Sequence, residues 1–389
     1  MRRGKKRRIG KVPAWIAAAL LAGAAAVSLA PLLAPALSQA ALFSAVLAMP
    51  EGAFSALLSG LKEGGGAPLE AVSPLPGQGE RKPEVSSVPS PESGEEPDLR
   101  TGGLPEGAKP LPYIAPDIPE EYRRPVLQED FSGAATRAAI PIGNYWLRND
   151  TELAREEIER LLQAPRIPAL SDTAEPQVLI YHTHATESFA PYDSDSYDNR
   201  YNWRSTDNNN NMVAVGAVMA RVLRSQGIGV VHDTSQHDYP SYNGSYANSY
   251  RSIKRYLEQY PTIKVVLDLH RDAIEREGGL IVKPTAEIGG EKYAQLMIVS
   301  NCDDGTGLLP NWRENLRFAG AFCARIEREY PGLTRPILFS YRKYNQQLST
   351  GALLLEFGSH ASTLEEAKRT AEAAGSALAG LLLEGKSNP

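Results

Sequence analysis

The sequence contains only two cysteines, Cys302 and Cys323, which excludes a zinc site built from thiolates. It also lacks a glycine-rich phosphate-binding loop and a G-x-S-x-G nucleophile elbow. Basic residues are scarce beyond the N-terminus, because residues 12–389 carry 34 Lys and Arg against 46 Asp and Glu, a net charge of −12. Nothing in this acidic body supports binding to nucleic acid.

The N-terminus holds a concentrated positive charge. Residues 1–11 carry seven basic side chains and no acidic one, and residues 12–50 carry no charge. The apolar part of this stretch, 14–33, is long enough to cross a bilayer as a helix. The preceding Lys and Arg favour a cytoplasmic N-terminus, so we expect a basic cytoplasmic segment over 1–11, a transmembrane anchor over 12–35 and a body outside the cytoplasm. A cleaved signal peptide, with a weak cleavage site over 37–40, is the alternative.

Composition then divides the rest of the chain. Proline, glycine, serine and glutamate dominate from about residue 63 to 125, and such a stretch buries too little apolar surface to offset the entropy of ordering it. We therefore expect a disordered Pro/Gly/Glu-rich linker over 36–125 and a catalytic domain over 126–389. In that domain short apolar runs alternate with helical stretches, which predicts an α/β fold with a mixed or mostly parallel sheet flanked by helices (phosphorylase/hydrolase-like).

Three of the expected strands end in side chains that bind metals or move protons. Ligands of open α/β sheets bind beyond the carboxyl ends of the strands. Imidazole and carboxylate suit zinc, and a catalytic zinc needs three protein ligands and one open position. The strand over 178–180 leads to His184 and Glu187, the strand over 265–269 to His270, and the strand over 353–355 to Glu356.

These residues predict a catalytic zinc site. We expect His184, Glu187 and His270 to bind Zn²⁺, with Asp207 and His182 as alternatives for the middle ligand. Metal-assisted hydrolysis of an amide also needs a carboxylate that takes a proton from water and passes it to the leaving amine. We expect Glu356 to do this, because a carboxylate at the end of an apolar strand is costly without a function or a partner.

The residues after His270 suggest supporting roles. Arg271 is a candidate to bind a substrate carboxylate or the oxyanion, and Asp272 is a candidate to orient an imidazole. Farther from this strand, Tyr242 and Tyr246 share a helical face with Tyr250. That face suits packing on the sheet as well as a platform for substrate.

Several segments, in this order along the chain, resemble the stage II sporulation protein P family. They are Ile180–Phe189, Ser205–Asp207, His237–Asn243, Asp268–Ala273, Leu355–Gly358 and Thr363–Lys368. The resemblance implies a membrane-anchored hydrolase that cleaves peptidoglycan as an N-acetylmuramoyl-L-alanine amidase and as an endopeptidase. It also implies action during engulfment of the forespore, beside a sporulation lytic transglycosylase and a membrane anchor protein.

That family is in turn similar to zinc-dependent N-acetylmuramoyl-L-alanine amidases, whose ligands are His, Glu and His with a catalytic Glu. In order along the chain, His184, His270 and Glu356 take the first, third and catalytic positions. The middle position departs from the pattern, because Asp207 stands where the amidases have Glu. The H-x-x-E spacing of His184 and Glu187 instead resembles zinc carboxypeptidases. A carboxypeptidase-type peptidase acting on wall peptides and a non-catalytic wall-binding scaffold are therefore the alternative functions.

Overall fold

The computed structural model describes residues 118–133 and 139–387. The basic segment 1–11, the predicted anchor 12–35 and the linker up to residue 117 lie outside these residues. Across the two described ranges, no helix combines the length and the apolar character needed to cross a membrane. Regular structure begins with the 3-10 turn η1 (Glu120–Tyr122) and strand β1 (Arg123–Glu129), just before the predicted boundary at 126.

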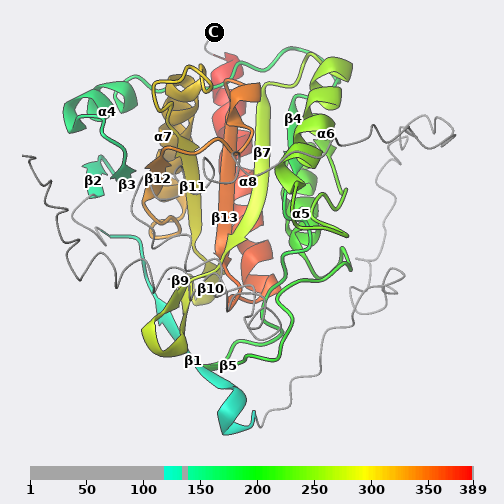
Figure 1. Ribbon diagram of the computed structural model, residues 1–389. Helices are drawn as coiled ribbons and strands as arrows, with labels where there is room; N and C mark the ends of the chain where they lie inside the picture. The colour runs from blue at the N-terminus through cyan, green and yellow to red at the C-terminus, as the bar shows by residue number, and fades with distance from the viewer. Residues whose placement is uncertain (1–117, 134–138, 388–389) are drawn as a thin grey trace, which may run out of the picture. The chain divides into compact units, whose positions relative to one another are not determined.

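An eight-stranded sheet forms the centre of the domain, in the order β2-β3-β12-β11-β13-β7-β4-β6 (Figure 1). Two of its strand pairs, β2–β3 and β11–β13, are antiparallel, and the other five are parallel. The prediction of a mixed, mostly parallel sheet is confirmed. The strands are β2 (Ala139–Ile142), β3 (Tyr145–Asp150), β4 (Val178–Tyr181), β6 (Val230–His232), β7 (Val265–Asp272), β11 (Leu296–Asn301), β12 (Ile337–Ser340) and β13 (Ala352–Ser359).

The antiparallel pairing of β11 with β13 divides the sheet by direction. β4, β6, β7 and β13 are parallel to one another and end at one edge, whereas β3, β11 and β12 end at the opposite edge. His184 and Glu187 follow β4, and His270 and Glu356 lie in the carboxyl-terminal halves of β7 and β13, so this topology brings the candidate residues to the same edge.

Alternate residues of the central strands face two different cores. In β7, Val265 and Leu267 pack in the large core with α5, α7 and α8, whereas Val266 packs in a smaller core with Ile253 of α6. Because side chains alternate along a strand, His270 faces the α6 side of the sheet. The helices are α4 (Arg155–Leu162), α5 (Met212–Ser225), α6 (Ser245–Gln259), α7 (Trp312–Glu329) and α8 (Leu364–Ser387).

The start of α5 follows from its sequence. Asn211, the last of four consecutive asparagines, accepts a hydrogen bond from the backbone N–H of Val213 and so caps the helix. The predicted helix end at Ser225 is confirmed, and Gly227 follows it at φ +79°. Gly216 lets the helix pass close to the sheet, because a Cβ there would lie 2.6 Å from the rings of His182 and His232.

A second, five-stranded sheet was not foreseen. It has the order β10-β9-β1-β5, with β8 pairing with β9. Its strands other than β1 are β5 (Ser196–Asp198), β8 (Glu275–Arg276), β9 (Leu280–Ile288) and β10 (Glu291–Ala294). β5 belongs to the long loop between β4 and α5, so its pairing with β1 fixes that loop.

A buried lysine also holds this loop. Lys283 of β9 is fully buried, and its Nζ lies 2.6 Å from Asp193 Oδ1 in the loop and 2.7 Å from Glu366 Oε1 at the start of α8. A buried cation requires such partners. The loop that leads away from His184 and Glu187 is therefore fastened to both the small sheet and α8.

Candidate active site

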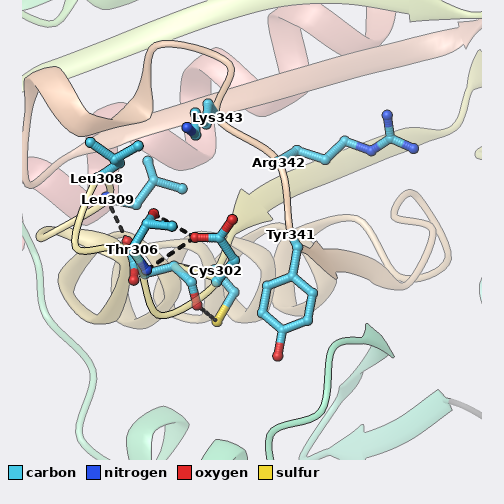
Figure 2. Close-up of a pocket in the computed structure, with 9 residues that line it drawn as sticks. Cys302, Thr306, Leu308, Leu309, Tyr341, Arg342 and Lys343 are labelled. Carbon is cyan, nitrogen blue, oxygen red and sulfur yellow. Dashed lines mark hydrogen bonds between the residues drawn. The ribbon is translucent and has the colours of Figure 1, made fainter. Parts of the chain in front are cut away.

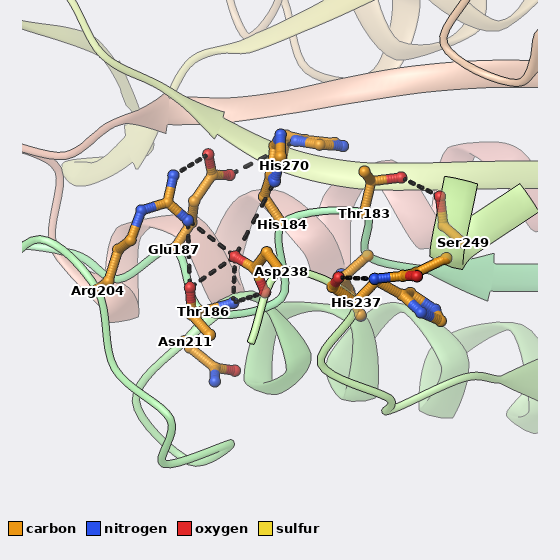
Figure 3. Close-up of polar contacts among 12 residues, drawn as sticks. Thr183, His184, Thr186, Glu187, Arg204, Asn211, His237, Asp238, Ser249 and His270 are labelled. Carbon is orange, nitrogen blue, oxygen red and sulfur yellow. Dashed lines mark hydrogen bonds and ion pairs between the residues drawn. The ribbon is translucent and has the colours of Figure 1, made fainter. Parts of the chain in front are cut away.

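His184 and Glu187, just after β4, converge with His270, which lies near the carboxyl end of β7 (Figure 3). The ring centroids of His184 and His270 are 5.2 Å apart. Glu187 Oε2 lies 3.6 Å from His270 Nδ1, and it accepts a hydrogen bond of 3.2 Å from the backbone N–H of Arg271. All three side chains are buried. The structure thus brings together the residues for which the sequence predicted a zinc site.

Two of these side chains take the protonation states that a metal site needs. Burial lowers the pKa of His184 to about 4, so its imidazole is neutral at pH 7. Burial by itself would raise the pKa of Glu187, but its contact with His270 and the charge of Arg271 outweigh this and hold that pKa well below its usual range. A neutral imidazole and an ionised carboxylate are the forms that bind a metal.

Asp268 orients the second imidazole. Its Oδ1 lies 2.9 Å from His270 Nε2, and its carboxylate accepts hydrogen bonds from the N–H and the hydroxyl of Thr183 at 2.8 and 2.7 Å. Burial opposes a charge on His270, yet the carboxylates of Asp268 and Glu187 raise its pKa well above the usual value. Asp272, the residue that the sequence offers as a candidate for this role, instead accepts a hydrogen bond of 2.9 Å from Arg335 Nη1 through its Oδ2.

The imidazole of His184 has a carboxylate neighbour as well. Asp238 Oδ2 lies 4.0 Å from His184 Nδ1 and accepts hydrogen bonds from Thr186 Oγ1 at 2.6 Å and Arg204 Nη1 at 2.8 Å. His184 Nδ1 itself is buried without a hydrogen-bond partner among the described residues. Asp238 lies in the loop after β6, far along the chain from His184, so no local pattern marked it as part of the site.

Glu356 lies beside His270. The two residues are paired in register across β13 and β7, and Glu356 Oε2 is buried without a hydrogen-bond partner in the described part of the chain. Burial, together with the charge of Asp272, raises the pKa of Glu356 to about 8. The strand then bulges at Gly358, at φ +64°, where a Cβ would collide with Ser362 Oγ.

The guanidinium of Arg271 binds the backbone of the loop between β4 and α5. It is buried and donates to the carbonyl oxygen of Ser188 at 2.6 Å through Nε and to that of Trp203 at 2.7 Å through Nη2. In this arrangement Arg271 holds the loop next to the site. The substrate contact predicted for it stays a prediction.

The two alternative metal ligands lie in other networks. The carboxylate of Asp207 accepts hydrogen bonds from Asn209 N at 3.0 Å and Asn210 Nδ2 at 2.6 Å, and so shapes the turn before α5. His182 is fully buried, with Nδ1 3.2 Å from the carbonyl oxygen of Leu269 and Nε2 2.9 Å from His232 Nε2. Of the candidates for the middle ligand, Glu187 is the one in contact with His270.

Aromatic rings pack against the outer side of His184. Tyr242 stacks on the His184 ring at 4.5 Å and is 42% exposed, so it lies at the mouth of the site. Tyr246 meets His184 edge-on at 5.6 Å and stacks on Tyr344 at 5.3 Å. Tyr242 is therefore the tyrosine available to substrate, while Tyr246 serves packing.

The donor atoms suit zinc, although they are not gathered around one point. Within residues 118–133 and 139–387, no three His, Cys, Asp or Glu side chains are arranged to hold a metal ion. The chemistry nevertheless fits, since two imidazoles and a carboxylate are an established ligand set for catalytic zinc. The unpartnered Nδ1 of the neutral His184 also points to a missing partner. Zinc binding stays a prediction.

A separate small pocket lies at the opposite edge of the sheet, beyond the ends of β11 and β12 (Figure 2). Asp303 in its wall accepts hydrogen bonds from the backbone N–H groups of Gly305, Gly307 and Leu309. Burial raises the pKa of the neighbouring Cys302 thiol to about 12, so the thiol is not a nucleophile at neutral pH. Cys302 and Cys323 are both free and buried.

The described residues thus form a mixed α/β domain with a buried histidine–carboxylate site where parallel strands end. Residues 142–379, more than half of the chain, match the stage II sporulation protein P (SpoIIP) family, and the chain belongs to this family. The family predicted from the sequence motifs is confirmed.

Comparison with individual proteins gives a sequence relative and several partly similar structures. Stage II sporulation protein P of Bacillus subtilis (strain 168) is 33% identical over 208 residues, which are 51% of this chain and 49% of the relative, so the match spans about half of that relative. N-acetylmuramoyl-L-alanine amidase AmiC2 of Nostoc punctiforme overlaps 55% of this chain and 98% of its own, at 14% identity and a TM-score of 0.33. The CwlD amidase from Clostridioides difficile, solved in complex with the GerS lipoprotein, overlaps 55% and 100% at 10% identity and a TM-score of 0.33.

Proposed function

We propose that this protein is a zinc-dependent peptidoglycan hydrolase of sporulation that cleaves the N-acetylmuramoyl-L-alanine amide bond. The observation that carries the proposal is the convergence of His184, Glu187 and His270, with Glu356 beside His270 on the next strand. Membership of the stage II sporulation protein P family supports the biological setting.

His184, Glu187 and His270 would hold the metal ion. Zinc, when bound, polarises an amide carbonyl and acidifies water. Asp268 fixes the ring of His270 and Asp238 borders the ring of His184, so each imidazole has a carboxylate neighbour. A carboxylate in direct contact with a ligand imidazole, as Asp268 is with His270, sets the orientation of the ring.

Glu356 moves the proton in this proposal. In its ionised form, the Glu356 carboxylate accepts a proton from the attacking water, and the resulting acid passes that proton to the nitrogen of the leaving L-alanine. A proton-transfer group works best when its pKa lies near the working pH. The fold raises the pKa of Glu356 to about 8, which keeps both of its forms accessible near neutral pH.

The remaining parts of the proposal concern the location of the protein, a second activity and its partners. Residues 12–35 would anchor the chain as a single-pass membrane protein with the catalytic domain outside the cytoplasm, as the basic segment 1–11 suggests. The protein would also cleave cross-linked stem peptides as an endopeptidase. Its partners would be the lytic transglycosylase and the membrane anchor protein of the engulfment machinery.

A carboxypeptidase-type activity on wall peptides is the second candidate. It is favoured by the H-x-x-E spacing of His184 and Glu187, two residues that the structure holds in one cluster. In that case the enzyme would remove terminal residues of stem peptides and leave the muramoyl amide intact.

Digestion of purified sacculi by the full-length chain in detergent tests the proposal. Mass analysis of the products distinguishes the activities: free stem peptides indicate an amidase, separated cross-linked dimers an endopeptidase, and loss of terminal D-alanine alone a carboxypeptidase. Activity should disappear with a chelator and return with zinc, in step with the metal content of the protein. Intact sacculi after treatment with the zinc-loaded protein would leave a wall-binding scaffold as the function.

A further inference from the structure

Arg204 lies at the rim of the site, next to Glu187 (Figure 3). The two residues form an antiparallel backbone bridge, and the guanidinium carbon of Arg204 lies 4.8 Å from the centre of the Tyr242 ring. The Arg204 side chain is 38% exposed. A cation is thus fixed between solvent and the candidate metal ligands.

The hydrogen bonds of Arg204 occupy only one of its nitrogens. Nη1 donates to Asp238 Oδ2 at 2.8 Å and to Thr186 Oγ1 at 3.1 Å. A guanidinium has five N–H donors, and in the described part of the chain Nε and Nη2 of Arg204 donate no hydrogen bond. Nη2 forms an ion pair with Glu187 Oε1 at 3.8 Å, which is too long for a hydrogen bond. The Nε–Nη2 edge of Arg204 therefore has unused N–H donors.

Two other arginines nearby have this edge filled. The Nε and Nη2 atoms of the buried Arg271 donate to the backbone carbonyls of Ser188 and Trp203. Those of Arg200 donate to the carboxylate of Asp198, at 2.9 and 2.6 Å. Arg204 differs from both because the Nε and Nη2 atoms of its fork donate no hydrogen bond to the described residues, and it differs from Arg271 because its side chain is partly exposed.

We propose that the Nε–Nη2 edge of Arg204 is a binding subsite for a carboxylate of the stem peptide. This inference rests on the proposed function. An arginine fork matches a carboxylate with two parallel hydrogen bonds. The buried carboxylates of Asp238 and Glu187 hold the partly exposed guanidinium of Arg204 in place.

The geometry also limits where the carboxylate lies in the substrate. Nη2 of Arg204 is 3.8 Å from Glu187, one of the proposed metal ligands. A charge-assisted hydrogen bond adds about 2.8 Å, and one residue of extended peptide spans about 3.3–3.6 Å. A carboxylate bound by Arg204 therefore lies within about two residues of the candidate metal ligands, and we assign it to the second stem residue.

A matched pair of muramoyl peptides tests the subsite, one with a free carboxylate on the second stem residue and one with a carboxamide there. Using the zinc-loaded full-length chain, we expect kcat/KM to be roughly 10- to 100-fold higher for the free acid, mostly through KM, because the carboxamide loses one of the two charge-assisted hydrogen bonds. Arg204→Gln should abolish this preference, and Arg204→Lys should keep part of it while retaining a cation beside Asp238. Arg200→Lys, in the same loop but with its fork on Asp198, is the matched control and should keep the full preference.

The ratio of the kcat/KM values for the two substrates distinguishes a direct contact between Arg204 and the substrate from a purely structural role of Arg204. If Arg204 acted only by positioning Asp238 and His184, its variants would slow both substrates equally and leave the ratio unchanged, which would overturn the proposal. Equal kcat/KM values for both substrates in the unmodified protein would overturn it too, while leaving the amidase function intact. If the unmodified protein cleaves neither substrate, the proposed amidase function is wrong. The carboxylate subsite at Arg204 is then wrong as well, because it rests on that function.

Discussion

Replacement of Glu356 by glutamine removes a carboxyl group whose ionisation the fold opposes. Burial raises the pKa of Glu356 to about 8, and the nearby carboxylates of Asp272 and Glu187 act in the same direction. His270 and Arg335 act against it. Glutamine keeps the size and the hydrogen-bonding capacity of the protonated acid but carries no charge at any pH, so the variant isolates the effect of the proton.

The expected stability difference follows from the two pKa values. Below pH 4.5 the carboxyl is protonated in the folded and the unfolded chain, and the variant gains nothing. Between pH 4.5 and about 8 the folded state binds more protons than the unfolded state, so the unmodified protein loses stability as pH rises. At about 1.4 kcal/mol per pKa unit, the loss approaches a ceiling of about 5 kcal/mol above pH 8.

Denaturant unfolding of the metal-free proteins, followed by tryptophan fluorescence, measures this difference. We expect the free energy of unfolding of Glu356→Gln to match that of the unmodified protein near pH 4 and to exceed it by several kcal/mol, on the order of 3–5, at pH 9. A difference that is the same at both pH values would show that the pKa of Glu356 is not raised, and the burial argument would be wrong.

The same variant separates metal binding from catalysis. Because Glu356 is placed as the proton-transfer group, Glu356→Gln should bind zinc and sacculi normally while its turnover falls about 10²- to 10⁴-fold. Hydrolysis of sacculi at nearly the normal rate would remove Glu356 from the mechanism. Loss of zinc would make Glu356 a ligand.

Three further predictions concern the anchor and the metal site. With residues 12–35 as a membrane anchor, protease added to protoplasts should digest the body of the protein, and recovery of that body in the cytosol would contradict the topology. Glu187→Ala should lose bound zinc, whereas Asp207→Ala should keep it, because Asp207 is tied to the turn before α5; elemental analysis of both variants decides between the two ligands. Asp268→Asn should weaken zinc binding about 10- to 100-fold in competition with a chromogenic chelator, because the ring of His270 loses the carboxylate that orients it; unchanged affinity would make Asp268 a purely structural residue.

The strands that carry the candidate site were predictable because their signal is local. A short apolar run that stops at a polar residue marks a buried strand and its end, and the runs before His184, His270 and Glu356 all became strands that end at the same edge of the sheet. The start of α5 was predictable for the same reason, because the short polar side chain of Asn211 caps the helix.

Other features depended on segments that are distant in sequence. In the second sheet, β1 pairs with β9 and β5. The sequence of β1 carries no pattern that identifies these distant partners. The contact between Asp238 and Arg204 beside the site likewise joins two loops that are distant in sequence.

The family, the mixed α/β class and the convergence of imidazole and carboxylate groups could be predicted from the sequence, since they follow from motifs and from the ends of apolar strands. The contacts of the neighbouring charged groups depend on tertiary packing. Asp268 and Asp272 are both two residues from His270 along β7, but Asp268 contacts the His270 ring, whereas Asp272 pairs with Arg335, which is distant in sequence. Arg271 is buried against loop carbonyls while Arg204 keeps an open edge, because burial and hydrogen-bond partners are set by how distant loops pack.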